Sequence, residues 1–164
     1  MSPDVSTTSL SALADGTDDN SQFDTFKQRK TAFLECVRSF NFKPKRGIKQ
    51  LIQQGFIPDD KPESIAKFLL ENDSLSKAGI GEYLGEGDQQ NIDIMHAFVD
   101  FMDFKDKSFL GALRFYLEHF RLPGESQKID RFMLKFAEKY VTDNPDTVFA
   151  NAEAVYILSY SRHQ

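Results

Sequence analysis

Apolar residues recur along this chain at the three- and four-residue intervals of an α-helix. One predicted helical face carries Phe23, Phe26, Phe33, Val37 and Phe40. No window of useful length shows the alternation of apolar and polar positions that marks a half-buried strand. The chain is therefore predicted to be all-α from about residue 23 onward.

Proline and glycine divide this helical region into short elements. Pro44 opens a helix that Gly55 ends, and Pro62, followed by an acid in the first turn, opens the next. Further helices are expected over residues 77–84, 91–102, 108–120 and 125–142, and from about 148 onward. This spacing predicts an array of short, tightly connected helices instead of a bundle of long ones.

Composition separates a tail from a single domain. Residues 1–22 are rich in Ser, Thr and Asp and hold too little apolar surface to offset their ordering entropy, so a disordered polar tail is expected there. Residues 23–164 then form one domain, which suits a chain of 164 residues that is 40% hydrophobic.

Charge and cysteine content exclude several classes of protein. The net charge of −5 argues against a nucleic-acid binder, whose footprint would be basic. One cysteine and three histidines exclude a disulfide framework and a zinc site of known spacing, and Cys36 is interpreted as a buried, inert thiol. No apolar run approaches the ~20 residues of a membrane span and no secretory signal is recognised, so a cytoplasmic location is expected.

One segment carries the most specific signal. Residues 120–131 read Phe-Arg-Leu-Pro-Gly-Glu-Ser-Gln-Lys-Ile-Asp-Arg and join two predicted helices. The breaker pair Pro123-Gly124 is followed at once by Glu125, so a carboxylate is expected to be exposed at the tip of a tight turn, at the start of a helix. From spacing alone, Glu125 is a helix-start acid, which typically stabilises a helix by about 0.3–1 kcal/mol.

This segment resembles the first signature motif of the Sec7 domain, the exchange module for Arf-type small GTPases. The resemblance covers residues 23–161 and is most like the large, Golgi-associated branch. It is also carried by residues 41–52, 65–69, 81–88 and 95–100. The resemblance implies a right-handed superhelical array of short helices, without a cofactor or metal.

The resemblance further implies a guanine-nucleotide exchange factor that promotes GDP release from an Arf-family GTPase in vesicle trafficking. Glu125 would be the invading glutamate, which opposes the β-phosphate and magnesium ion and competes for the P-loop lysine. Two unit charges ~4 Å apart interact by ~4 kcal/mol at an effective dielectric of 20, about a thousandfold in an equilibrium constant. No bond is made or broken, so the chain is expected to be an exchange factor and not an enzyme in that sense.

Other residues of the two motifs are candidates for binding the GDP-bound GTPase. Asp130 is the first choice for a polar contact, although a run of mixed charges also suits a solvated helix face. Tyr160 and Ser161 resemble the pair found in members sensitive to brefeldin A, whereas a core tyrosine is the alternative reading of Tyr160. The full set of expected partner contacts is Leu122, Pro123, Gly124, Gln127, Lys128, Asp130, Arg131, Ile157 and Tyr160.

The resemblance stops inside the second motif, where the chain reads Arg162-His163-Gln164 and ends. An incomplete domain is therefore expected, lacking one wall of the GTPase groove. The alternative function is a non-catalytic helical fragment with weak or no partner binding. By resemblance the protein would be recruited peripherally to Golgi membranes, and no membrane-binding element is recognised in the chain.

The glycine-rich segment at residues 79–87 is a false candidate for a phosphate loop. No strand precedes it, and its glycines fit neither the dinucleotide fingerprint nor the P-loop spacing. They are interpreted as helix caps and close helix contacts. No bound nucleotide is expected.

Overall fold

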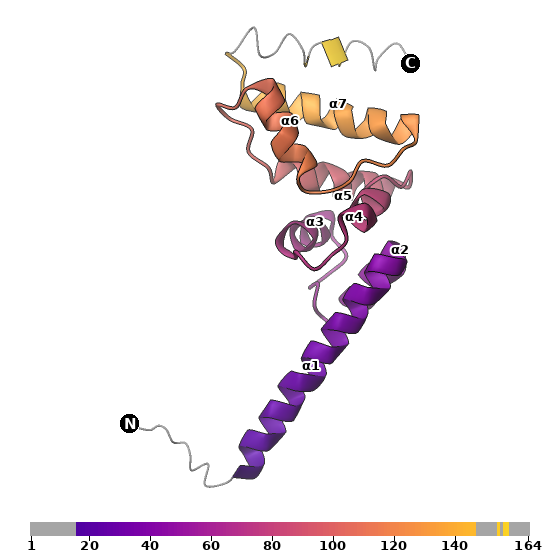
Figure 1. The fold of residues 1–164 in the computed structure, drawn as a ribbon, viewed down its shortest axis with the longest axis vertical. Helices are drawn as coiled ribbons and strands as arrows, with labels where there is room; N and C mark the ends of the chain where they lie inside the picture. Colours follow the sequence, from indigo (N-terminus) through magenta and orange to yellow (C-terminus); the bar gives the residue numbers. More distant parts are fainter. Residues whose placement is uncertain (1–15, 147–153, 155, 158–164) are drawn as a thin grey trace, which may run out of the picture. The chain divides into compact units, whose positions relative to one another are not determined.

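A computed structural model describes residues 16–146, 154, 156 and 157 of the chain. Within the stretch 16–146 every regular element is a helix, so the all-α prediction is confirmed there (Figure 1). The helices are α1 (Gly16–Phe42), α2 (Pro44–Gln53), α3 (Pro62–Glu71), α4 (Lys77–Leu84), α5 (Gln89–Asp100), α6 (Phe109–Leu117) and α7 (Ser126–Asp143). The chain divides into two compact units, with the boundary between Cys36 and Val37.

The predicted start and stop signals act as expected. Pro44 and Pro62 each occupy the first position of a helix, where a missing N–H costs nothing. Gly55 follows α2 with a φ of 80°, a left-handed conformation that glycine adopts without strain. Ser76 and Ser108 cap α4 and α6, since each side-chain oxygen accepts a hydrogen bond from the N–H three residues on.

Two helix boundaries differ from the sequence expectation by three residues or more, and the ends of α5 and α7 differ by one or two. The helix α1 begins at Gly16, seven residues before Phe23, because extending a formed helix by a turn costs far less than nucleating one. The helix α6 ends at Leu117 instead of residue 120, because the N–H groups of Glu118 and His119 donate to carbonyls only three residues back. Such bonds tighten and close a last turn. The tail prediction for residues 1–15 and the helix expected from 148 to 153 lie outside the described residues.

The first unit contains most of α1, and its apolar stripe is only partly buried. Phe23 and Phe26 are 60% and 66% exposed, whereas Cys36 is buried as predicted. Burial raises the pKa of the Cys36 thiol, which keeps it in its unreactive protonated form.

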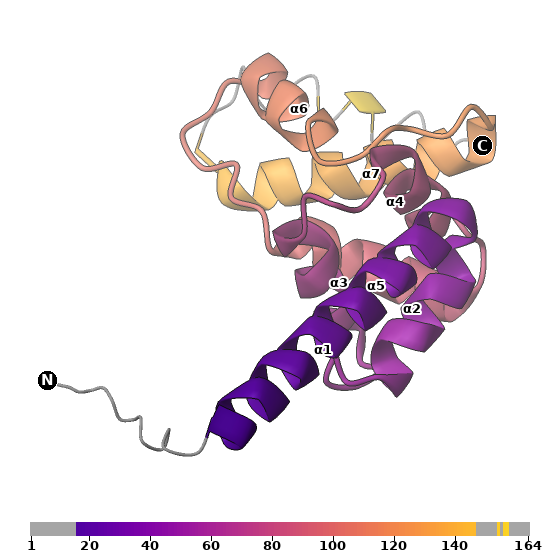
Figure 2. The same cartoon turned by 60° about the horizontal axis from the view of Figure 1, so that its bottom comes forward.

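In the second unit α5 is the central helix, since it packs against α3, α4 and α7. Figures 1 and 2 both show α6 lying beside α7, and residues of these two helices pack together. Edge-to-face and stacked rings fill the space around them. The buried aromatic residues there are Phe98, Phe104, Phe109, Tyr116, Phe120, Phe132, Phe136 and Tyr140. No helix of the described residues combines the length and apolar character needed to cross a bilayer.

Candidate functional site

Glu125 stands where the sequence predicts, at the junction between the 118–125 connection and α7. It is the N-cap residue of α7, with extended backbone angles (φ −83°, ψ 130°), and it follows a bend at Gly124. Its side chain makes no capping hydrogen bond and is 60% exposed. Its backbone carbonyl accepts hydrogen bonds from the N–H groups of Lys128 and Ile129, both at 3.0 Å. The carboxylate is therefore free to extend from a backbone position that the helix fixes.

Among the residues that the structure describes, the Glu125 carboxylate has one close charged neighbour. Its Oε1 lies 3.0 Å from the Nζ of Lys128, three residues further along α7. Lys128 is 20% exposed, so its stem is held against the protein while Glu125 remains largely in water. Exposed pairs of this kind contribute roughly 0–1 kcal/mol, so the contact orients the carboxylate without locking it.

Buried aromatic rings fix both ends of the segment that carries Glu125. Phe120 precedes the segment and Phe132 follows it on α7; their rings stack with centroids 4.8 Å apart, and both are buried. The hydroxyl of Tyr116 on α6 donates to the Phe132 carbonyl at 2.9 Å. These contacts hold both ends of the short connection between α6 and α7 in the buried core.

Helix α4 supports the same segment from a second side. The N–H of Arg121 donates to the carbonyl of Lys77 at 3.0 Å, and Gly81 lies directly against the Arg121 backbone. One turn further on, Gly85 lies beneath the Lys128 stem and the Phe132 ring. The interpretation of the 79–87 glycines as caps and close contacts is confirmed for Gly79, Gly81 and Gly85, whereas an added Cβ on Gly87 would meet nothing within 4 Å.

Sequence reasoning missed this support for the Glu125 segment. The three contact points on α4 recur every fourth residue, at positions 77, 81 and 85, and so share one helical face. That spacing is visible in the sequence. The partner of the face, however, lies 40 residues away along the chain.

Most of the other candidates on the first motif lie along the first turns of α7. Gln127 is exposed and Asp130 is half-buried. Arg131 is also half-buried, and its guanidinium donates a hydrogen bond to the carbonyl of Gly85. Arg131 therefore has an internal partner that ties α7 to the end of α4.

Of the candidates before Glu125, Leu122 lines a hollow beside the motif. Leu122 and Pro123 are half-buried and Gly124 is exposed. The hollow is lined by Lys77, Leu117, Phe120, Arg121 and Leu122. Ile157 is half-buried in the described fragment of a helix, and Tyr160 and Ser161 lie outside the described residues.

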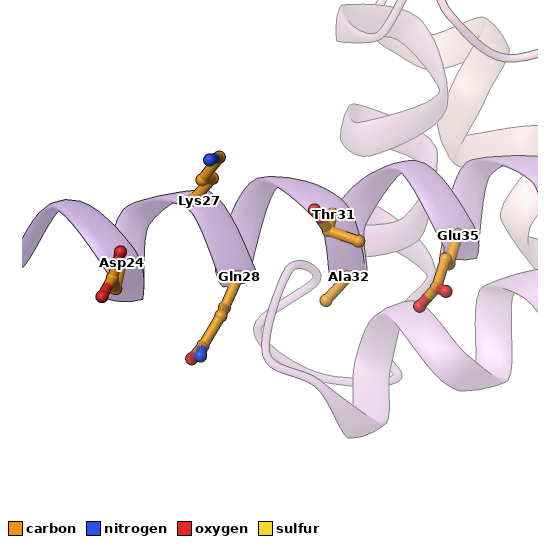
Figure 3. Close-up of a pocket in the computed structure, with 6 residues that line it drawn as sticks. All are labelled: Asp24, Lys27, Gln28, Thr31, Ala32 and Glu35. Atoms are coloured by element: carbon orange, nitrogen blue, oxygen red, sulfur yellow. The ribbon is translucent and has the colours of Figure 1, made fainter.

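A second hollow lies on α1 and makes a poorer site. Figure 3 shows that all six side chains come from this one helix, so no second element encloses the space. They carry charges of both signs, and five of them are exposed. The residues are Asp24, Lys27, Gln28, Thr31, Ala32 and Glu35.

The chain was compared with known families. The family model described as "Sec7 domain" matches residues 29–163. The chain belongs to the Sec7 domain family. The family predicted from residues 120–131 is thus confirmed by a match that covers most of the chain. Its large Golgi-type branch is supported by the relatives that follow.

Named relatives agree with this assignment. The chain is 56% identical over 158 residues to the ADP-ribosylation factor guanine nucleotide-exchange factor SEC7 of Saccharomyces cerevisiae, which covers 96% of this chain and 8% of that protein. It is 47% identical over 154 residues to the human brefeldin A-inhibited guanine nucleotide-exchange protein 1, covering 93% of this chain and 8% of that protein. The chain thus spans about a twelfth of the length of these curated relatives.

Two solved structures share the fold. The crystal structure of the Sec7p catalytic domain matches with a TM-score of 0.69 and 59% identity, over 71% of this Sec7-family chain and 61% of that one. The structure of ARF1-GDP bound to a Sec7 domain complexed with brefeldin A matches with a TM-score of 0.69 and 42% identity, over 73% and 61%. The expected Sec7-like helical array is therefore the observed one.

Proposed function

We propose that this chain is a guanine-nucleotide exchange module that promotes GDP release from an Arf-family small GTPase. One observation carries the proposal: Glu125 is an exposed carboxylate on a segment held by buried rings and by α4. Relatives named as exchange factors for ADP-ribosylation factor, and a matching Sec7 domain solved with ARF1-GDP, support the choice of partner.

The proposed chemistry is electrostatic displacement. A carboxylate that enters the nucleotide site repels the β-phosphate, weakens the hold on the magnesium ion and offers the P-loop lysine another partner. Rigidity matters because a fixed charge loses little entropy when it is inserted, and Pro123 restricts the approach. Glu125 must break its ion pair with Lys128 before it can pair with the P-loop lysine of the GTPase. The weakness of an exposed ion pair permits this step.

The docking surface proposed around Glu125 is the exposed start of α7. The exposure of Gln127 and the partial exposure of Asp130 support contacts with the GTPase through both residues. Arg131 holds α7 against the end of α4, and its own contact with the GTPase stays a prediction. Contacts through Ile157 and Tyr160, and brefeldin A contacts through Tyr160 and Ser161, stay predictions of the family resemblance. Peripheral recruitment to Golgi membranes during vesicle transport is proposed on the same basis.

The test is a nucleotide-exchange assay with an Arf-family GTPase loaded with a fluorescent GDP analogue. Glu125→Gln removes the charge and keeps the shape, so it is expected to lower the exchange rate at least a hundredfold. Glu138→Gln is the matched control, since Glu138 is another exposed acid of α7, and its rate is expected to stay within twofold. Equal rates for Glu125→Gln and the unaltered chain would contradict the proposal, and absence of stimulation by the unaltered chain would favour a non-catalytic binding fragment.

A further inference from the structure

We propose that Gly81, in α4, is a positioning residue that sets where Glu125 is presented. This inference rests on the proposed exchange function. Gly81 lies forty residues before Arg121, outside the motif that carries the glutamate. It acts through the backbone of the segment that leads to Glu125.

The argument begins with the contact between Gly81 and Arg121. A Cβ atom built on Gly81 would lie 1.8 Å from the Arg121 carbonyl oxygen and 3.0 Å from its carbonyl carbon. Real Cβ atoms do not approach other atoms this closely, so only glycine permits the observed packing. The obstacle is main chain, which cannot rotate aside as a side chain would.

The same residue is held to α4 by a hydrogen bond. The N–H of Arg121 donates to the Lys77 carbonyl at 3.0 Å, one helical turn before Gly81. Both backbone polar groups of Arg121 therefore face α4. Any atom added at Gly81 pushes Arg121 away from this helix and stretches its hydrogen bond.

A displacement of the Arg121 backbone can be accommodated only on its C-terminal side. Phe120, on one side, is buried and stacked on Phe132, so it resists movement. Beyond Gly124, α7 is anchored by Arg131 to the carbonyl of Gly85. The displacement must be taken up between Arg121 and Gly124, which is the stretch that aims Glu125.

The other glycines near the site impose no such constraint. At Gly87 and Gly124 an added Cβ would meet nothing within 4 Å. At Gly85 an added Cβ would lie 2.9 Å from the Gly81 carbonyl oxygen of the preceding turn, 3.3 Å from the Lys128 Cδ and 3.4 Å from the Phe132 ring, so it would crowd its neighbours without meeting the backbone of the segment that leads to Glu125. Gly47 is as tightly packed as Gly81, but against the backbone of Phe40 at 2.3 Å.

These differences provide matched variants for the exchange assay. Gly81→Ala is expected to lower kcat by about 10- to 100-fold, since a misplacement of about 1 Å can cost that much. The KM for the GTPase is expected to stay within about threefold, because Gln127 and Asp130 are untouched. Gly87→Ala controls for adding a methyl group nearby, and Gly47→Ala controls for a backbone clash elsewhere; both are expected to keep kcat per folded molecule.

Amide hydrogen exchange supplies a readout that does not depend on activity. In the unaltered chain the Arg121 amide should exchange at least tenfold more slowly than that of exposed Gly124. Gly81→Ala should abolish this protection while the amides of α7 around Phe136 stay protected. Gly47→Ala, whose effect is structural only, should leave Arg121 protected.

The outcomes separate this inference from the proposed function. An unprotected Arg121 amide in the unaltered chain overturns the inference even if Gly81→Ala does not fold, and so does an unchanged kcat for a folded Gly81→Ala. If the unaltered chain fails to stimulate exchange, the proposed function is wrong. In that case a Gly81→Ala variant that keeps Arg121 protected refutes the positioning role as well.

Discussion

At the scale of single residues, Glu125 is the group on which the proposed activity depends, and Lys128 is its only close charged neighbour that the described residues reveal. In the free domain, this ion pair competes with any partner group for the Glu125 carboxylate. Glu125 is 60% exposed, so water competes strongly for it. The exposure argues for a weak, readily broken contact.

A double-mutant cycle measures the strength of this pair. Lys128→Met keeps the stem that packs by Gly85 and removes the charge, while Glu125→Gln removes the other charge. The coupling between them in the free energy of unfolding, measured by urea denaturation, is expected to be below about 1 kcal/mol. A coupling above about 2 kcal/mol would mean that Glu125 is locked onto its own helix and unavailable to a partner.

At the scale of elements, side chains at the end of α7 organise the loop that precedes α6. Asn144 is buried; its Oδ1 accepts from the N–H of Asp106, and its Nδ2 donates to the carbonyls of Phe104 and Tyr140 at 2.9 and 3.0 Å. Asp143 accepts from the N–H of Phe104 at 2.9 Å. These bonds let Asp106 adopt its left-handed φ of 61°. The loop is thus held as part of the folded unit.

Asn144→Ala is expected to destabilise the domain by about 3 kcal/mol. It removes three hydrogen bonds, each typically worth about 0.5–1.5 kcal/mol of net stability. Chemical denaturation measures the change. Asp146→Ala, at an exposed neighbouring acid, is the control and is expected to shift stability by less than about 0.5 kcal/mol. A comparable stability for the two variants would show that the network is dispensable.

At the scale of the whole molecule, burial of aromatic side chains in the second unit makes its stability depend on alkaline pH. Tyr83 is only 5% exposed, and burial raises its pKa to about 12 from an ordinary value of 10.0. Burial also raises the pKa of Tyr116, whose hydroxyl is held by the Phe132 carbonyl. The folded state therefore favours the neutral form of both tyrosines over the ionised form.

Stability is therefore expected to fall as the pH rises above about 10. The unfolded chain ionises Tyr83 near pH 10 and the folded chain only near pH 12, so ionisation stabilises the unfolded state relative to the folded state across this window. The rise in the pKa of Tyr83 from 10.0 to about 12 corresponds to about 2–3 kcal/mol of stability at most. Tyr83→Phe should lose correspondingly less stability than the unaltered chain between pH 9 and pH 12, as followed by urea denaturation. Parallel curves for the two proteins would contradict the burial argument.

The sequence by itself determined the helices and the place of the glutamate. Pro44, Pro62 and Gly55 act locally, through fixed or left-handed φ angles, so their effects are visible without a fold. Glu125 was placed at the start of a helix by the breaker pair before it, and residues 120–131 resemble one family closely enough to name it. These conclusions need only neighbours along the chain.

Only the tertiary structure decided what holds the glutamate in place. The contact of Gly81 with Arg121, the bond from Arg131 to Gly85 and the network of Asn144 each join residues about 40 positions apart. No local pattern specifies such pairs, because they arise when separate helices pack. The family resemblance groups Arg131 with the partner-binding residues, and the fold adds an internal acceptor that the sequence does not reveal. A sequence reveals which residue carries the charge, and packing determines where that charge is aimed.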